Sequence, residues 1–167
     1  MMELINHLLL TEAFLVKGHV DTGGRRLTNF LNGHQKAFFP IYDVTMIAMD
    51  GGDKILSNEA FVPLDSVVLA HEFLEEGGDT IAKRLGRKEL PTASISAFYR
   101  GAFKLDLAGR IRPKTVEDAN GVNPFFVVQD PTVAGLGQRK AREFNLLRKL
   151  PYLILNRKKL DAVFLYD

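Results

Sequence analysis

The sequence predicts an all-β chain with one or two short helices, folded as two tandem small barrels. Three observations support this fold class: short segments of alternating hydrophobicity, few helical patterns, and one order of features that occurs twice. The chain has 167 residues, enough for one ordinary domain or two very small ones. With 46% hydrophobic and 25% charged residues, it carries enough apolar surface to form a packed core.

Alternation of apolar and polar residues marks the strands. The clearest runs are Phe14–Val20 and Ile95–Leu105, and each is expected to form one half-buried antiparallel strand. Further strands are expected at Phe38–Ala48, Ala60–Pro63 and Val67–Glu72. Turn-forming residues separate these segments, as is typical of small closed sheets that avoid long bare edges.

Helical signals are few, and one polar stretch divides the chain. Leu27–Leu31 predicts a single turn, Asp79 is expected to cap a short helix through Leu85, and Phe144–Leu150 is a third candidate. Residues 75–91 are polar, charged and contain Gly-Gly. We therefore expect an acidic barrel at residues 1–76, a connector at 77–91 with a possible short helix, and a basic barrel at 92–167.

An internal repeat relates the two halves. Residues 13–46 and 97–133 share the order of a basic-Gly strand, a turn, a polar stretch and a double Phe. The matched positions are Lys17-Gly18 with Arg100-Gly101, Arg26-Leu27 with Arg110-Ile111, Phe38-Phe39 with Phe125-Phe126, Asp43 with Asp130, and Thr45 with Thr132. Residues 61–70 likewise match residues 154–163 as strand, polar turn and strand. The sequence therefore predicts a duplication of one unit.

Charge divides along the same boundary. Residues 1–80 hold five Lys or Arg and twelve Asp or Glu, whereas residues 81–167 hold seventeen and eight. The halves thus carry −7 and +9, although the whole chain carries only +2. A basic surface attracts polyanions such as RNA, and it equally attracts the acidic half of another copy.

Most enzyme classes lack the residues that they need. There is no Cys, so thiolate chemistry, disulfides and Cys-ligated metals are excluded. The four histidines have no metal-type spacing, and we expect them to be ordinary surface or half-buried residues. Asp50, Asp53, Glu75 and Glu76 lie in Gly-rich turns, which are poor places for catalytic carboxylates. We expect no enzyme activity, no cofactor and no metal.

The first residues show no targeting signal, and no apolar run approaches the roughly 20 residues of a membrane span. We therefore expect a cytoplasmic protein without membrane contact. The strongest binding candidates are cations of the second half, with Phe144 and Tyr152 among them as candidate base-stacking residues or, more simply, core residues. The candidate nucleic-acid site consists of Arg139, Lys140, Arg142, Arg148, Lys149, Arg157, Lys158 and Lys159. Asn156 to Lys159 alternatively reads as a plain hairpin turn.

The stretch from Val16 through the LTNFLN and FFPIYDVTM segments resembles the first motif of Sm-like small β-barrels. Residues 61–72 stand in the place of their second motif, and the likeness covers residues 10–73 and, less closely, 93–166. The RRLTNFLN string also resembles uncharacterised bacterial domains with an R-L-[ST]-[DN]-F-L-N signature. The resemblance implies two five-stranded, strongly bent, Sm-like or SH3-like barrels that join through edge strands, with rings as the typical assembly.

In RNA-binding Sm-like proteins the first motif carries Asp and Asn, and the second carries Arg-Gly. The resemblance places Asn29 or Asn32 at the first position here, with Asn120 or Asn123 in the second unit. The second motif reads Pro-Leu-Asp from residue 63 and Asn-Arg-Lys from residue 156. We therefore expect a structural or protein-interaction module that self-assembles as a homo-oligomer. RNA binding by the basic half, or an acidic protein partner, is the alternative.

Overall fold

A computed structural model describes residues 6–51, 53–73, 92–112, 123–136 and 142–166. The described chain is mostly β, as the sequence predicted, and its strands form one antiparallel ten-stranded sheet that is open at both ends. The strands are β1 (Asn6–Thr11), β2 (Phe14–His19), β3 (Phe38–Ala48), β4 (Lys54–Pro63), β5 (Val67–Phe73), β6 (Ala93–Arg100), β7 (Lys104–Ile111), β8 (Phe125–Ala134), β9 (Tyr152–Asn156) and β10 (Ala162–Tyr166).

Helical elements are short and lie in the connections between strands. They are the α-helix α1 (Leu27–Gly33) and the 3-10 turns η1 (Leu64–Ser66), η2 (Arg142–Arg148) and η3 (Arg157–Lys159). The predicted helical segments at residues 27–31 and 144–150 therefore correspond to α1 and, with 3-10 geometry, to η2. The helix predicted from Asp79 and the connector lie outside the described residues.

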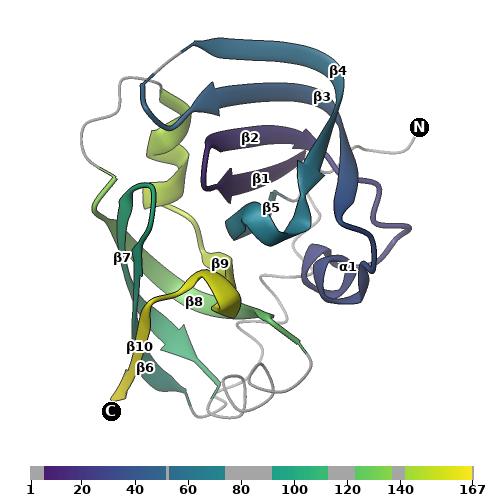
Figure 1. The fold of residues 1–167 in the computed structure, drawn as a ribbon. Coiled ribbons are helices and arrows are strands. Elements are labelled where there is room, and N and C mark those ends of the chain that lie inside the picture. Colours follow the sequence, from purple (N-terminus) through teal and green to yellow (C-terminus); the bar gives the residue numbers. More distant parts are fainter. Residues whose placement is uncertain (1–5, 52, 74–91, 113–122, 137–141, 167) are drawn as a thin grey trace.

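The sheet repeats one strand order twice. Its full order is β10-β6-β7-β8-β9-β5-β1-β2-β3-β4. We call β1–β5 the first set and β6–β10 the second set. Within each set the fifth strand pairs with the first, and the first four pair in sequence. In Figure 1 the first set forms the upper part of the molecule and the second set the lower part.

Ladder registers match between the sets position by position. Val16 lies between Leu9 and Met46, and in the second set Leu107 lies between Ala97 and Val133. At the other end of each set, Ile41 faces Ala60 and Val128 faces Leu153. The sets therefore share their pairing geometry as well as their order, and the matches from Phe38 to Thr45 and from Phe61 to Ala70 are confirmed.

The same bulge occurs in both sets. In the ladder between β2 and β3, the register shifts at Gly18, which lies opposite two residues, Asp43 and Val44. In the ladder between β7 and β8, Gly109 likewise lies opposite two residues, Asp130 and Pro131. Asp43 and Asp130 have φ of 52° and 49°, a left-handed conformation that Asp adopts more readily than most residues. The repeated Asp therefore marks a repeated bend of the sheet.

Three details of the predicted repeat are wrong. Arg26 and Leu27 stand at the start of α1, whereas Arg110 and Ile111 end β7, so these two pairs do not correspond. Gly18 corresponds to Gly109 and not to Gly101, so the first match was shifted by one strand. The predicted strand Ile95–Leu105 is broken by a turn at residues 101–103, which joins β6 to β7. The alternation continues through this turn because Tyr99 pairs with Leu105, and paired residues point to the same face of a sheet.

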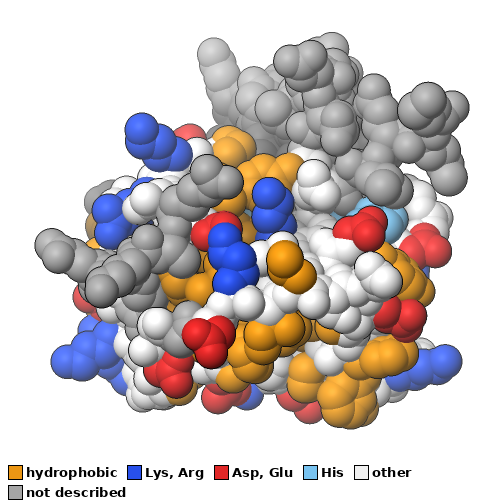
Figure 2. Space-filling view, turned by 90° about the horizontal axis from the view of Figure 1, so that it is seen from above, with side chains coloured by type: hydrophobic (Ala, Val, Ile, Leu, Met, Phe, Trp, Pro, Cys, Tyr) orange, Lys and Arg blue, Asp and Glu red, His pale blue; other side chains and the backbone are white. Residues whose placement is uncertain are grey.

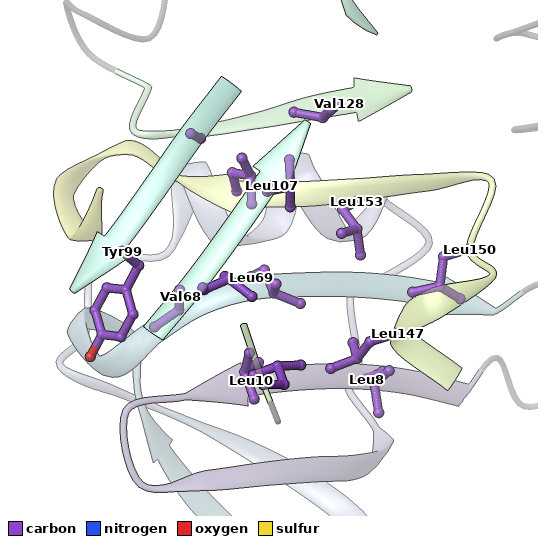
Figure 3. Packing of buried hydrophobic residues seen from close by; sticks show 14 of the residues in the cluster. Leu8, Leu10, Val68, Leu69, Tyr99, Leu107, Val128, Leu147, Leu150 and Leu153 are labelled. Atoms are coloured by element: carbon purple, nitrogen blue, oxygen red, sulfur yellow. The ribbon is translucent and has the colours of Figure 1, made fainter. Parts of the chain in front are cut away.

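Buried apolar side chains form two clusters, and each contains residues of both sets. One cluster combines the interior of the second set with Leu8, Leu10, Val68 and Leu69 of β1 and β5. Figure 3 shows these side chains pointing into the same space as Leu107, Val128 and Leu153 of the second set and Leu147 of η2. The other cluster combines the interior of the first set with three side chains of the second, Phe125, Tyr152 and Ile154. Each set therefore completes the core of the other.

Candidate functional site

The two sets meet where β5 pairs with β9. The ladder joins Leu69 to Leu155 and Ala70 to Ile154, and the exposure of each of these side chains is 1% or less. β1, β5 and β9 are buried along nearly their whole length, so they have neighbours on both faces. At this junction the edge of β5, the fifth strand of the first set, pairs with the edge of β9, the fourth strand of the second set.

Polar groups of both sets bond across the junction. His71 Nδ1 donates to the carbonyl oxygen of Tyr152 at 3.0 Å, and the Tyr152 hydroxyl donates to the carbonyl oxygen of Glu72 at 3.1 Å. Asn156 Nδ2 donates to the carbonyl oxygen of Val67 at 2.9 Å. Because these groups are buried, their pairing removes a desolvation cost and fixes how the strands meet. Burial lowers the pKa of His71 to about 4.

A buried carboxylate ties the start of α1 to this region. Glu72 Oε2 accepts from the Leu27 backbone N–H at 3.2 Å and lies 3.3 Å from His7 Nε2. His7 Nδ1 accepts from the Val20 N–H at 3.0 Å, so the ring proton lies on Nε2 and points at Glu72. A side chain 45 residues away therefore satisfies the first backbone donor of this helix.

The sequence pattern did not predict this polar cluster. His7 and His71 are 1% and 3% exposed, in contrast to the expected surface or half-buried positions. The available signal was the unbroken apolar run from Val67 to Ala70, which is typical of a strand buried on both faces. The two residues that follow, His71 and Glu72, continue that buried strand.

The sheet ends at β4 and β10, and among the described residues neither strand has a partner on its outer side. Both ends expose large hydrophobic side chains. On β3 and β4 these are Phe38, Tyr42, Ile55, Leu56 and Phe61, with exposures from 37% to 74%. On β10 they are Phe164, Leu165 and Tyr166, with exposures from 49% to 58%. Unpaired edges of this kind are a template for pairing with another strand.

β4 and β3 are the uppermost strands in Figure 1, and Figure 2 views the molecule from that side. Hydrophobic side chains gather on this face, with charged side chains between and around them. β10 lies at the opposite, lower end of the molecule in Figure 1. The two apolar edges therefore do not meet within one chain.

The predicted basic site is divided between the two ends of β9. Arg148 and Lys149 precede this strand, and η3 follows it. Five residues of extended chain span about 16 Å, so the length of β9 lies between these two groups of cations. Phe144 and Tyr152 are each 5% exposed and belong to the core, as the simpler interpretation predicted. Arg142 begins η2, whereas Arg139 and Lys140 lie outside the described residues.

η3 itself has a structural role. Asn156 Oδ1 accepts from the Lys158 N–H at 3.1 Å, and Lys159 forms an ion pair with Glu12 of the first set. The turn joins β9 to β10, which pair with other strands, so the hairpin predicted for residues 156–159 is wrong. η1 joins β4 to β5 in the same way. Nucleic-acid binding by the basic residues stays a prediction.

A small polar pocket of about 150 Å³ lies where α1, η1 and η3 approach one another. Its lining includes Asn32, His34, Asp65 and Lys158. The Asn32 amide is already paired with Phe125, because it donates to the carbonyl oxygen at 3.0 Å and accepts from the N–H at 2.9 Å. Within the described ranges no group of three His, Asp or Glu side chains is arranged to hold a metal ion. Nor does any described helix have the length and apolarity to cross a membrane.

Comparisons of this chain with protein-family models, with curated proteins and with solved structures found no match.

Proposed function

We propose that this chain is a non-catalytic structural module that assembles with copies of itself through the edges of its sheet. One observation supports this proposal above the others. Inside the chain, a fifth-strand edge already pairs with a fourth-strand edge at β5 and β9. A fourth-strand edge, β4, and a fifth-strand edge, β10, remain at the two ends of the sheet.

The exposed residues at both ends support association. Eight large hydrophobic side chains on β3, β4 and β10 are at least 37% exposed. Covering a side chain of this size contributes about 1.5–3 kcal/mol, and open strand edges add backbone hydrogen bonds. These ends are thus better suited to a partner than to water.

We also propose that each five-strand set is a Sm-like unit. The repeated strand order, with the fifth strand beside the first, supports this, as does the repeated bulge after the double Phe. The assembly is then built from units that occur in pairs along each chain. The proposal assigns no catalytic residue and no cofactor.

Measurement of molar mass in solution tests the function. We expect sedimentation equilibrium of the wild-type chain to give a multiple of the single-chain mass at micromolar concentration. The double variant Phe61→Asp, Phe164→Asp places a charge on each end and should sediment as a monomer. Leu146→Asp is the matched control, because Leu146 is 37% exposed but lies in η2, outside both edge strands. A wild-type chain that stays monomeric at every concentration and at low salt contradicts the proposal.

A further inference from the structure

We propose that Asn32 is a site of spontaneous deamidation, which the folded chain suppresses and which, once it occurs, removes a hydrogen-bonded link between α1 and β8. Asn32 is followed directly by Gly33, and these two residues end α1. An asparagine before a glycine is especially reactive, because glycine has no Cβ to obstruct the approach of its own nitrogen to the side chain. The proposal is independent of self-assembly.

The reaction proceeds through a five-membered ring and needs only water as co-reactant. The Gly33 nitrogen attacks Cγ of Asn32, so an N–Cγ bond forms, the bond from Cγ to Nδ2 breaks, and the Gly33 proton leaves with the amide as ammonia. Water then adds to one of the two carbonyl groups of this succinimide and opens it to aspartate or isoaspartate. One water is consumed and one ammonia is released, without oxidation or reduction.

Both polar atoms of the Asn32 side chain bind the backbone of Phe125. Nδ2 donates to the carbonyl oxygen at 3.0 Å, and Oδ1 accepts from the N–H at 2.9 Å. Phe125 begins β8, and the ladder between β7 and β8 ends farther along that strand, with Arg110 opposite Gln129. The Asn32 amide therefore takes the place of a strand partner for Phe125.

The same arrangement opposes ring closure in the folded chain. Two hydrogen bonds hold the Asn32 side chain on β8, away from the backbone that must attack it. Gly33 belongs to α1, and in an α-helix the backbone N–H groups donate to carbonyl oxygens four residues earlier. Phe30 and Leu31 fix the helix in the core that Phe125 shares. The reaction therefore requires the last turn of α1 to open, and its rate follows the population of that opened state.

Either product breaks the link to Phe125. Aspartate keeps an acceptor for the N–H, but its second oxygen stands where Nδ2 donated and faces the carbonyl oxygen as another acceptor. That carbonyl oxygen loses its donor, which costs more than the hydrogen bond contributed. Isoaspartate in addition inserts a carbon into the main chain of α1. Because ammonia is lost to the solvent, the change accumulates with the age of the molecule.

Peptide mass spectrometry tests the site. Trypsin cuts after Arg26 and Lys36 and releases a peptide with Asn32 and with Asn29, which no glycine follows. The full chain is incubated at mildly alkaline pH with and without denaturing urea. We expect Asn32 to deamidate in urea and at least about 10-fold more slowly in the native chain. Asn29 should react slowly in both. Equal rates at Asn32 in the two conditions overturn the proposed suppression.

A second Asn-Gly pair provides the reference for the chemistry. Asn120-Gly121 lies outside the described residues and falls in a different tryptic peptide. In urea it should react at a rate similar to that of Asn32, because both chains are then unfolded. Reaction at Asn120 without reaction at Asn32 overturns the assignment of the site.

Gly33→Ala is the matched variant for the mechanism. A Cβ atom at this position would meet only the flexible Arg25 side chain, at 3.3 Å, so the fold should be retained, which circular dichroism checks. In urea the added methyl group should slow deamidation of Asn32 at least about 10-fold, since it obstructs the attacking nitrogen. An unchanged rate in Gly33→Ala contradicts ring closure through this nitrogen.

Hydrogen exchange tests the consequence for α1. The Phe30 N–H donates to the Arg26 carbonyl oxygen at 2.9 Å, so its exchange reports opening of the helix. After the same period in urea and refolding, the Phe30 amide should exchange about 10-fold faster in the wild-type chain than in Gly33→Ala. Asn32→Asp that has not been aged should reproduce the fast exchange. Equal exchange in the two aged chains, with Asn32 deamidated only in the wild type, overturns the loss of the link.

Discussion

The ring of His71 and the backbone of Tyr152 are joined by a hydrogen bond of 3.0 Å, although 81 residues separate them in the sequence. The carbonyl oxygen can only accept, so Nδ1 of this imidazole carries the proton. A buried neutral histidine thus stands at the point where the two sets meet.

Acid should weaken the fold through His71. Its pKa is lowered from 6.5 to about 4, first by burial, with the Tyr152 carbonyl and the Glu72 charge opposing and the nearby His7 side chain adding the smallest contribution to the lowering. Between pH 6.5 and 4 the unfolded chain therefore binds a proton that the folded chain does not bind. Stability is complete above pH 6.5 and falls by about 3 kcal/mol as the pH drops to 4.

Urea unfolding at pH 7 and at pH 4.5 measures this loss. His71→Asn should reduce the difference between the two pH values, because it removes the titrating ring from the junction. The same change at the partly exposed His34 should leave the difference in place. Equal pH dependence in the wild-type chain and in His71→Asn contradicts the assignment.

Loss of the Asn32 amide should loosen α1 from the second set. Its two hydrogen bonds to the Phe125 backbone join elements of different sets. We expect Asn32→Ala to lower the free energy of unfolding by about 1–2 kcal/mol and to speed hydrogen exchange at the Phe125 amide. Asn29→Ala is the control, because Asn29 is exposed on the same helix. If Asn32→Ala and Asn29→Ala have the same free energy of unfolding, the two hydrogen bonds from Asn32 to Phe125 make no net contribution to stability.

The left-handed residues of the bulges should respond alike to substitution. Asp43→Gly and Asp130→Gly should each be neutral or stabilise by up to about 1 kcal/mol, since Gly adopts positive φ without strain. Asp43→Val and Asp130→Val should each cost about 1–2 kcal/mol for the opposite reason. Thermal unfolding of the four variants measures this. Opposite signs at the two positions argue against equivalent bulges.

A methyl group should not fit beside these bulges. At Gly18 a Cβ atom would lie 2.7 Å from the Tyr42 carbonyl oxygen, and at Gly109 it would lie 2.9 Å from that of Gln129. We expect Gly18→Ala and Gly109→Ala to destabilise the fold by about 1–3 kcal/mol, because backbone must move. Gly33→Ala, at the end of α1, should be close to neutral. Denaturant midpoints compare the three.

Local patterns predicted much of the strand content. The strand at Phe38–Ala48 has the expected ends, and Phe14–Val20 and Val67–Glu72 differ from β2 and β5 by one residue. The turn after Arg100 was missed because alternation kept its phase through it. Tyr99 pairs with Leu105, and both residue numbers are odd, so odd-numbered residues point to the same face of the sheet before and after the turn. Periodicity alone therefore did not reveal the hairpin.

Long-range contacts were beyond the reach of such patterns. Nothing local in the sequence indicates that β5 meets β9, and this contact decides that His71, Glu72 and Tyr152 are buried. The basic residues look continuous along the chain from Arg139 to Lys159, but β9 lies between Arg148 and Lys149 on one side and η3 on the other. The net charge of each half indicates only which sign of partner it attracts. Whether the cations of one half form a single binding surface depends on where the strands place them.

The two hydrophobic clusters have a consequence for how the chain comes apart. Because Leu8 and Leu69 of the first set pack among side chains of the second, and Phe125 of the second packs into the first, neither set can lose its structure without exposing the interior of the other. Heating should therefore produce one calorimetric transition for the whole chain and no surviving half.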